Sequence, residues 1–156
     1  LSYPTETIAY DSELLIAENG RHRIVDASVG GDLSGAPAWI DLEPYGPQHF
    51  SVHPWRSLFI SAAAPPDGDG AIFDVTASER AESAYFTGMF NPSGFALRPD
   101  GRQWLVSEFA EDGSLLDLAE AESGADLDAA ERFATGLEFP NGIAYRYVRD
   151  PAFDAE

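Results

Sequence analysis

The sequence contains no cysteine and no lysine, and it has no long hydrophobic run. Without cysteine the chain has neither disulfides nor thiolate metal sites. Its composition therefore does not indicate whether it works in an oxidising or a reducing compartment. No apolar run is long enough to cross a bilayer, so we expect no membrane span. No basic-then-apolar leader opens the chain, and among the compartments we favour the cytoplasm.

Positive charge is also scarce, because nine basic residues, all arginine, face 27 acidic ones and give a formal net charge of -18. Such a surface repels phosphate backbones, so we expect no nucleic-acid partner. Acid-rich, lysine-free composition is typical of proteins from salt-loving microbes. The alternative is an ordinary acidic protein from a GC-rich genome, and we favour the halophilic interpretation.

Four short segments of the chain begin alike. They open with Thr5-Glu6, Pro47-Gln48, Pro92-Ser93 and Pro140-Asn141. When the segments are stacked, one column holds Glu6, Gln48, Ser93 and Asn141, at steps of 42, 45 and 48 residues. A period of this length is typical of arrays of β-sheet units, most often propeller blades.

Each repeat predicts four short strands. The second strands are strongly apolar and are expected at 14–18, 58–62 and 104–108. Third strands are expected at 24–26, 72–74 and 115–117, and each ends in an aspartate that we expect to satisfy turn donors. Weaker fourth strands are expected at 38–42, 84–88 and 132–136. The acid- and alanine-rich segment 117–132 is interpreted as a long loop inside a blade.

These patterns predict an all-β fold, a β-propeller of four-stranded blades, with three blades and the first strand of a fourth present. The 156 residues form one propeller domain or part of one, with repeats at about 4–46, 47–91, 92–139 and 140–156. Three blades alone leave exposed sheet edges. The chain is therefore either a fragment of a longer propeller, which we favour, or half of a six-bladed ring that a homodimer closes.

The stacked column is the first candidate for function. In a propeller the first strand of each blade lines the central channel, and its start lies beside the end of the second strand. One mouth of the channel should therefore be ringed by Glu6, Gln48, Ser93 and Asn141. Carboxylate, amide and hydroxyl oxygens suit a hard divalent cation, Ca²⁺ before Mg²⁺.

Further residues lie near this mouth, each with a plainer alternative. Glu18 and Glu108 end second strands on the same face, where solvated loop acids are the alternative. His49 lies beside the ring and is interpreted as a channel-lining donor or a packed polar residue, not a metal ligand. Asn141 can equally belong to an Asn-Gly turn, whereas Glu6 needs a charge partner or a cation. The sequence shows no nucleophile elbow, phosphate loop or dinucleotide fingerprint.

One segment resembles a known family. Phe139-Pro140-Asn141-Gly142-Ile143-Ala144-Tyr145 is similar to the strand opening of the gluconolactonase, senescence marker protein and luciferin-regenerating enzyme group. Segments 16–25 and 91–101 resemble NHL-type propeller repeats. The resemblance implies a six-bladed propeller with one divalent metal, commonly Ca²⁺, at the channel mouth, where it activates a lactone or similar ester toward water.

By this resemblance Glu6 and Asn141 match two metal ligands of the family. A further aspartate ligand would lie beyond residue 156, and the acid of the family's Asn-Asp pair is missing near Ser93. Glu6 also lacks the usual Gly-Glu-Gly-Pro setting.

The expected function is a metal-dependent hydrolase acting on a lactone or related ester, with a small-molecule substrate. The residues expected to contact that substrate are Gln48, His49, Ser93, Glu18 and Glu108. The alternative is a non-catalytic NHL-like binding module or a structural segment of a larger assembly.

Overall fold

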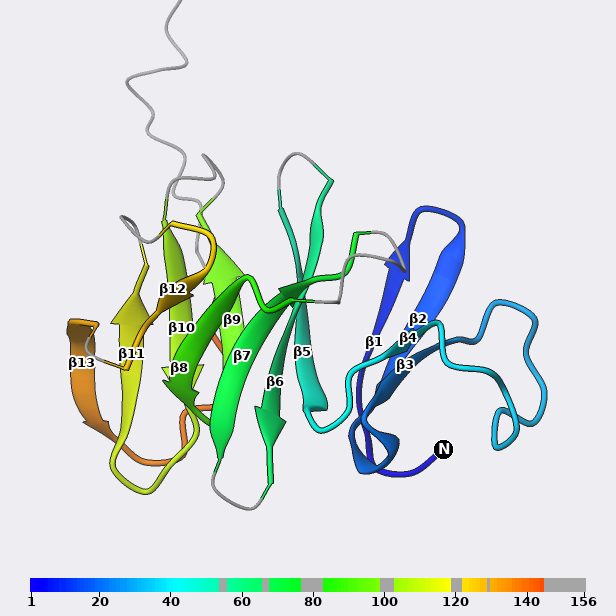
Figure 1. The fold of residues 1–156 in the computed structure, drawn as a ribbon, viewed down its shortest axis with the longest axis horizontal. Coiled ribbons are helices and arrows are strands. Elements are labelled where there is room, and N and C mark those ends of the chain that lie inside the picture. The colour runs from blue at the N-terminus through cyan, green and yellow to red at the C-terminus, as the bar shows by residue number, and fades with distance from the viewer. Residues whose placement is uncertain are drawn as a thin grey trace, which may run out of the picture.

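The structure is a computed structural model that describes residues 1–53, 56–65, 68–76, 83–98, 103–118, 122–128 and 130–144. These residues form strands β1 to β13 and one short 3-10 helix, η1 (Asn19–Arg21), and no α-helix occurs among them. The strands lie in three sheets (Figure 1). The predicted all-β class is therefore confirmed, and no sheet closes on itself within the described ranges.

Each sheet is built mainly from strands that follow one another along the chain. Sheet A has the order β1-β2-β3-β4, from β1 (Pro4–Tyr10), β2 (Glu13–Glu18), β3 (Arg23–Asp26) and β4 (Ile40–Asp41). Sheet B has the order β12-β8-β7-β6-β5, from β5 (Gly46–Val52), β6 (Leu58–Ala64), β7 (Asp69–Asp74), β8 (Phe86–Phe90) and β12 (Ala125–Asp126). Sheet C has the order β13-β11-β10-β9, from β9 (Pro92–Leu97), β10 (Trp104–Glu108), β11 (Gly113–Asp117) and β13 (Arg132–Leu137).

The three sheets lie in a row, with sheet B in the middle (Figure 1). Their first strands are neighbours, because β1 contacts β5 and β5 contacts β9. Side-chain hydroxyls add to these contacts between sheets: Thr5 Oγ1 of β1 donates to the Pro47 carbonyl of β5 at 2.9 Å, and Ser61 Oγ of β6 donates to the Ser93 carbonyl of β9 at 2.6 Å. The starts of the three repeats are therefore brought together at one place in the fold.

The middle sheet is apolar because both of its faces are covered. Alternate residues of a strand point to opposite faces, and in β6 Leu58 and Ile60 join the core with sheet A, whereas Phe59 joins the core with sheet C. Strand β7 divides in the same way, with Phe73 facing sheet A and Ile72 facing sheet C. This double burial explains why β6 is apolar at every position except Ser61.

The segment 117–132 departs from its prediction. It contains the short strand β12, which pairs in parallel with β8 through Ala125 beside Phe86 and Asp126 beside Thr87. A loop that leaves sheet C therefore completes the outer edge of sheet B. Parallel pairing of two residues carries almost no sequence signal, which is why the segment looked like an ordinary loop.

The predicted strand of a fourth repeat is not formed in the described residues, because 141–144 carry no strand assignment. The rest of that predicted strand, from Tyr145 onward, lies outside the described residues. Pro140 nevertheless lies against β9, where its carbonyl accepts a hydrogen bond of 2.9 Å from Ser93 Oγ. The segment thus makes the contact with sheet C that Pro47 makes with sheet A, without strand pairing.

The aspartates that end the third strands behave as predicted in sheets A and B. Asp26 Oδ1 accepts the Ser28 amide at 2.8 Å, and Asp74 Oδ1 accepts the Thr76 amide at 3.0 Å. Hydrogen bonds from Ser28 hold the pKa of Asp26 below its ordinary value. Asp117 differs, since it accepts a side-chain bond of 2.6 Å from Gln103.

Candidate functional site

The candidate site lies where the first strands of the sheets begin, and a β-bulge marks this place in every sheet. In sheet A, Pro4 pairs with Glu18 and Glu6 pairs with Ala17, which leaves Thr5 as the extra residue. The same irregularity lies between Pro47 and His49 in sheet B and between Val106 and Glu108 in sheet C. Bulges redirect side chains and are frequent beside functional sites.

The bulges correct the stacked column by one residue in the first repeat. Gln48 is the extra residue of sheet B, so its structural counterpart in sheet A is Thr5, whereas Glu6 corresponds to His49. Ser93 belongs with Thr5, and each donates from its hydroxyl to the proline carbonyl that opens the next segment, at 2.9 Å in both cases. The stacking missed Thr5 because it began the first segment at Thr5, whereas the strand pairings align Pro4 with Pro47 and Pro92.

Glu6 and His49 form a pair across β1 and β5. His49 Nδ1 lies 3.2 Å from Glu6 Oε2, with the two side chains 32% and 28% exposed. The same carboxylate accepts a hydrogen bond from the Phe50 amide. The side chain that partners Glu6 is thus a histidine of the neighbouring sheet, and the imidazole is positioned by a carboxylate while remaining partly open to solvent.

The tautomer of His49 follows from these contacts. The Glu6 carboxylate lies 3.2 Å from Nδ1 and can only accept, which favours the Nδ1–H tautomer of a neutral His49. Nε2 is then the acceptor. The ring is also steadied by an edge contact with Phe95, at a centroid distance of 6.3 Å. A half-exposed imidazole with a free acceptor nitrogen can take a proton from water.

Ser93 lies in a buried network rather than at an open mouth. Its hydroxyl is 3.1 Å from Ser107 Oγ, and Ser107 Oγ donates to the Gly94 carbonyl at 3.0 Å. Gly94 packs so closely on the next segment that an added Cβ would lie 2.8 Å from the Asn141 carbonyl oxygen. These contacts hold the segment around Asn141 in place, and the side chain of Asn141 belongs to an exposed residue.

Gln48 lines a recess of about 270 Å³ at the same end of the sheets. The polar side chains of this recess are three amides, from Asn19, Gln48 and Asn91. Asn19 lies over Gly46, where a Cβ would come within 2.5 Å of the Asn19 amide nitrogen, so this glycine is required for the packing. The sequence predicted that Gln48 lies at the mouth of a channel. It did not predict that Asn91 lies beside Gln48 in this recess.

Glu18 is fully buried, and the expectation of a solvated acid is wrong. Its Oε2 accepts Arg23 Nε at 2.7 Å, its Oε1 accepts the Ser2 amide, and Arg21 Nε lies 3.7 Å away. Burial would raise the pKa of this carboxyl, but the bonds from Arg23 and Ser2 and the two arginine charges hold the pKa below its ordinary value. These partners give Glu18 a structural role.

Glu108 is buried in the same way at 6% exposure. It accepts the Phe90 amide of sheet B at 2.8 Å and the Ser114 hydroxyl, and Arg132 Nη2 lies 3.3 Å away. Neither glutamate presents a free carboxylate to a substrate. The sequence did not predict that these two glutamates are buried, because nothing in a strongly acidic sequence indicates which acids have arginine partners.

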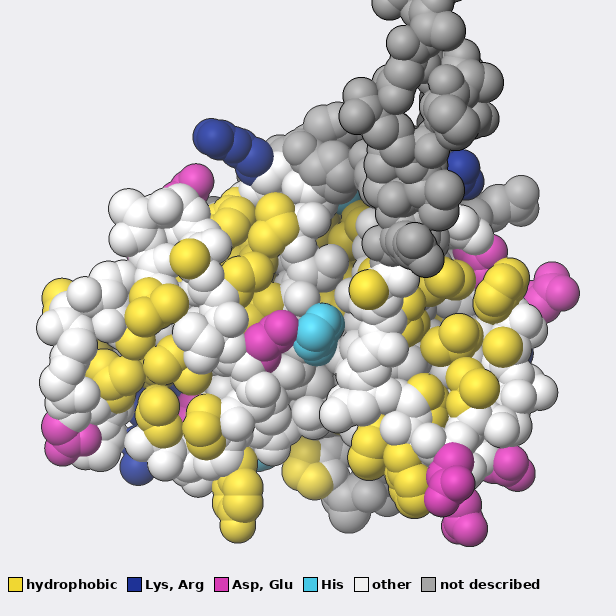
Figure 2. All heavy atoms as spheres, turned by 180° about the vertical axis from the view of Figure 1, so that it is seen from behind, with side chains coloured by type: hydrophobic (Ala, Val, Ile, Leu, Met, Phe, Trp, Pro, Cys, Tyr) yellow, Lys and Arg dark blue, Asp and Glu magenta, His cyan; other side chains and the backbone are white. Residues whose placement is uncertain are grey.

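The cation that the family resemblance implies finds a poor set of ligands here. Glu6 Oε2 is already engaged by His49 and the Phe50 amide. Within the residues that the structure describes, no three His, Asp or Glu side chains come together as a metal site. Figure 2 shows acidic side chains spread over one face rather than gathered in a patch. Glu6 therefore offers a cation little free capacity, and the role of Asn141 as a second ligand stays a prediction.

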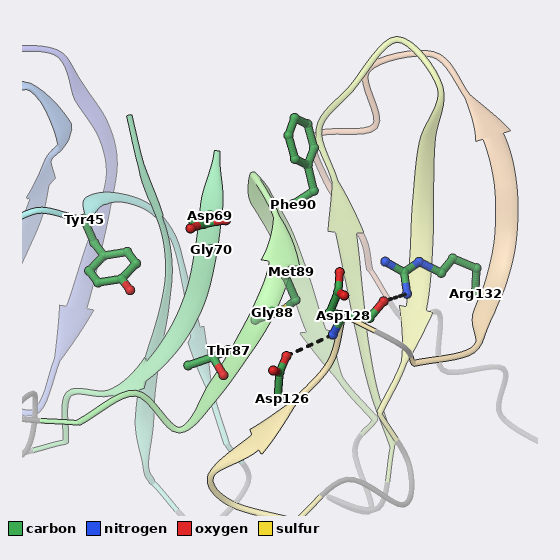
Figure 3. Close-up of a pocket in the computed structure, with 10 residues that line it drawn as sticks. All are labelled: Tyr45, Asp69, Gly70, Thr87, Gly88, Met89, Phe90, Asp126, Asp128 and Arg132. Carbon is green, nitrogen blue, oxygen red and sulfur yellow. Dashed lines mark hydrogen bonds between the residues drawn. The ribbon is translucent and has the colours of Figure 1, made fainter. Parts of the chain in front are cut away.

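A second, larger pocket of about 520 Å³ lies where β7 and β8 meet the β12 loop (Figure 3). Its polar groups hold that loop: Asp126 Oδ1 accepts the Asp128 amide at 3.2 Å, and Arg132 Nη1 donates to the Asp128 carbonyl at 3.2 Å. Gly88 has φ of 76°, and a Cβ there would lie 1.9 Å from Asp126 Oδ1. The polar lining therefore serves the docking of β12 on β8.

No protein-family model matches this sequence, and no curated protein matches it either. The described part of the chain contains no helix that is long and apolar enough to cross a membrane. The function is therefore inferred from the residues of the site itself.

Proposed function

We propose that the chain is a β-propeller-type domain whose sheets A, B and C are three successive blades. Consecutive antiparallel strands form each sheet, the first strands are neighbours, and the sheets pack face against face. These three features together are typical of propeller blades. The repeat spacing near 45 residues supports the same interpretation.

We further propose that this domain is a hydrolase acting on a lactone or related ester, as the resemblance to the gluconolactonase group implies. The observation that carries the proposal is the half-exposed Glu6–His49 pair, with 3.2 Å between Oε2 and Nδ1, at the bulged start of β1 and β5. In this proposal His49 is the general base and Glu6 orients it.

The reaction balances without any further reagent. His49 Nε2 takes a proton from a water molecule, whose oxygen bonds to the carbonyl carbon of the ester. The carbon–oxygen bond to the alkoxide then breaks, and the imidazolium returns its proton to the leaving oxygen, which yields an acid and an alcohol. Glu6 stabilises the transient imidazolium and fixes the ring orientation.

The experiment is a pH-stat assay of the purified chain against a panel of δ- and γ-lactones and aryl esters. We expect His49→Gln to lower kcat by about 100-fold, the usual size of a lost general base, and Glu6→Gln to lower it by a similar or smaller factor. The chain offers a matched control, since His22 Nδ1 lies 3.0 Å from Glu43 Oε2 in a second carboxylate–histidine pair. His22→Gln should leave the rate unchanged.

Two outcomes would contradict this mechanism. A wild-type chain that hydrolyses none of the panel would refute the hydrolase. Hydrolysis that requires Ca²⁺ and survives His49→Gln would replace the pair with the metal chemistry expected from the family resemblance.

The recess lined by Asn19, Gln48 and Asn91 favours a second candidate function, a non-catalytic binding module. Three amides offer both donors and acceptors, which suits an uncharged polar ligand rich in hydroxyl groups. This candidate gains support if lactones or sugars bind to the wild-type chain and to His49→Gln with equal affinity and without turnover.

A further inference from the structure

Phe90 is a large apolar side chain that the middle sheet leaves in solvent. It ends β8 and is 51% exposed, although sheet B is packed on both faces. Gly68, with φ of 76°, lets the ring lie close to the backbone between β6 and β7, since a Cβ there would come within 3.0 Å of Phe90 Cε2. The backbone at Gly68 therefore supports an aromatic ring that stays accessible.

The recess beside Gln48 and the larger pocket share this ring. Phe90 lines the recess of about 270 Å³ and also the pocket of about 520 Å³. Figure 3 shows the ring at one end of the larger pocket. The residues that line the recess lie between positions 19 and 91, and those of the larger pocket lie between 45 and 132. Neither end of the chain contributes to this place, and the sheet that carries Phe90 has a neighbour on both faces.

Gln48 has a side chain that the fold does not use. Its counterparts at the bulge, Thr5 and Ser93, each donate to the proline carbonyl that opens the next segment. Within the described residues the Gln48 amide makes no such bond and has no other hydrogen-bond partner. The side chain is half-buried in the recess, where its donors and its acceptor are available to a ligand.

Asn19 and Asn91 complete the polar lining of this recess, which we call the amide recess. Asn91 Nδ2 donates to the Phe109 carbonyl at 3.1 Å, and Asn19 Nδ2 lies 3.5 Å from the Pro47 carbonyl. Each of these contacts uses the amide nitrogen, so the two Oδ1 atoms remain as acceptors. Among the described residues that line it, the amide recess therefore presents amide donors and acceptors and no charged side chain.

The larger pocket adds polar groups beside the same ring. Asp69 is the cross-strand partner of Phe90 between β7 and β8, so its carboxylate lies near the ring. In the part of the chain that the structure describes, neither this carboxylate nor the hydroxyls of Tyr45 and Thr87 have a hydrogen-bond partner. These three groups are therefore not needed to dock β12 on β8.

Together the two hollows define the chemistry of a ligand. An exposed aromatic ring binds a flat apolar surface, and the unpaired amides and hydroxyls around it bind groups that both donate and accept hydrogen bonds. A pyranose sugar has both features, because its ring C–H bonds form an apolar face and its rim carries hydroxyl groups. Ligand sites commonly have volumes of about 300–1,000 Å³. The amide recess alone lies below this range, which favours a ligand that also enters the larger pocket.

We propose that an uncharged oligosaccharide of two or more rings binds across Phe90. One ring stacks on the Phe90 side chain and directs its hydroxyls to Gln48 and Asn91, and the next ring reaches Asp69. The carboxylate of Asp69 and the formal net charge of -18 repel sialylated chains. The inference rests on the binding-module candidate, whose recess it extends, and not on hydrolysis by the Glu6–His49 pair.

The first experiment is isothermal titration calorimetry of the full chain with cellobiose, maltose, lactose and diacetylchitobiose, and with the tetrasaccharides of cellobiose and maltose. We expect at least one of these neutral sugars to bind, and sialyllactose to bind about 10-fold more weakly than that sugar or not at all. Binding by none of the neutral sugars overturns the inference. Tighter binding of sialyllactose overturns it as well, because the site would then prefer an anion.

Substitutions at the ring and in the amide recess locate the ligand. Phe90→Ala removes the stacking surface, and Gln48→Thr installs the residue that sheet A has at the bulge. We expect each variant to weaken binding by about 10-fold or more, whereas Phe90→Tyr, which keeps an aromatic ring, should bind like the unmodified chain. Phe133→Ala is the matched control, because it removes a 63% exposed ring on β13 that lines neither hollow.

Two results with these variants would overturn the placement of the sugar. If Phe90→Ala and Gln48→Thr retain their circular dichroism spectra and still bind it, the sugar lies elsewhere. If His49→Gln abolishes binding, the ligand lies at the Glu6–His49 pair instead.

The outcome for this site is distinguishable from the outcomes for the proposed functions. Turnover is measured separately in the pH-stat assay, so a chain that binds the sugar without hydrolysing any ester refutes the hydrolase and supports this site. A chain that binds lactones through Gln48 but binds no oligosaccharide keeps the binding-module candidate and overturns the present inference.

Discussion

One cross-strand position holds an ion pair in sheet A and an apolar pair in sheet B. Glu18 pairs with Arg23 between β2 and β3, and Ala62 pairs with Ala71 between β6 and β7. In sheet C the position is intermediate, with Glu108 opposite Ser114 and Arg132 supplied from β13. The three repeats share a backbone, but they satisfy this position with different chemistry.

The difference follows from what lies against each sheet. Ala62 points into the core that sheets A and B share, which is built from apolar side chains. Glu18 lies on the face of sheet A that is turned away from sheet B, where the chain's own Ser2, Arg21 and Arg23 cover it. A carboxylate is tolerated only where it meets a full set of donors, since an unpaired buried charge costs several kcal/mol.

The largest expected effect comes from moving the charge into the middle sheet. Ala62→Glu would bury a carboxylate in the core between sheets A and B. Its cross-strand partner would be Ala71, whereas Glu18 in sheet A has Arg23 at this position. We expect the free energy of unfolding to fall by about 3–5 kcal/mol. Urea denaturation followed by circular dichroism measures it, and Ala62→Ser, which adds only a hydroxyl, should cost clearly less. Equal losses from the two variants would show that crowding, not charge, sets the cost.

A smaller effect comes from removing one partner in sheet A. Arg23→Leu removes the closest charged partner of the buried Glu18, and we expect the free energy of unfolding to fall by about 3 kcal/mol in the same denaturation assay. The double variant Glu18→Ala with Arg23→Ala reproduces the Ala62–Ala71 pair of the middle sheet. Its free energy of unfolding should fall by less than that of Arg23→Leu. If the double variant is instead less stable than Arg23→Leu, the ion pair itself stabilises sheet A, and an alanine pair cannot replace it there as it does in sheet B.

The smallest effect is on the pH dependence of stability. The pKa of Glu18 is held below its ordinary value of 4.5, so the folded state favours the ionised carboxyl. This contribution is present above pH 4.5 and is lost as the pH falls toward the lower folded pKa. Glu18→Gln should therefore flatten the decline of unfolding free energy on the acid side. An unchanged slope in the variant would mean that Glu18 titrates alike in both states.

The apolar pattern of the sequence predicted the strands well. The second and third strands of all three repeats are present, because short apolar runs bounded by turn residues have few alternatives to a strand. The aspartates of the turns at Asp26 and Asp74 were predicted too, since their partners lie two residues away. Local chemistry of this kind can be derived from sequence alone.

The site was harder to predict because it depends on contacts between repeats. Glu6 lies beside His49, on a strand more than 40 residues away, and the stacked column placed it with Gln48 because the first segment was started at Thr5 and not at Pro4. The column identified the right end of the sheets but the wrong pairing. Burial of Glu18 and Glu108 depends on arginines and amides brought in by other strands, and no local pattern reports them.

The docking of β12 on β8 has a consequence for how the chain is made. During synthesis, strands β5 to β8 emerge long before Ala125 and Asp126, the residues that complete the outer edge of sheet B. Until then β8 presents unpaired backbone groups to any neighbouring nascent chain. Sheet B is thus completed only after most of sheet C has been synthesised. Ribosome-bound intermediates that end before residue 125 therefore have an open edge at β8, and we expect them to be prone to aggregate.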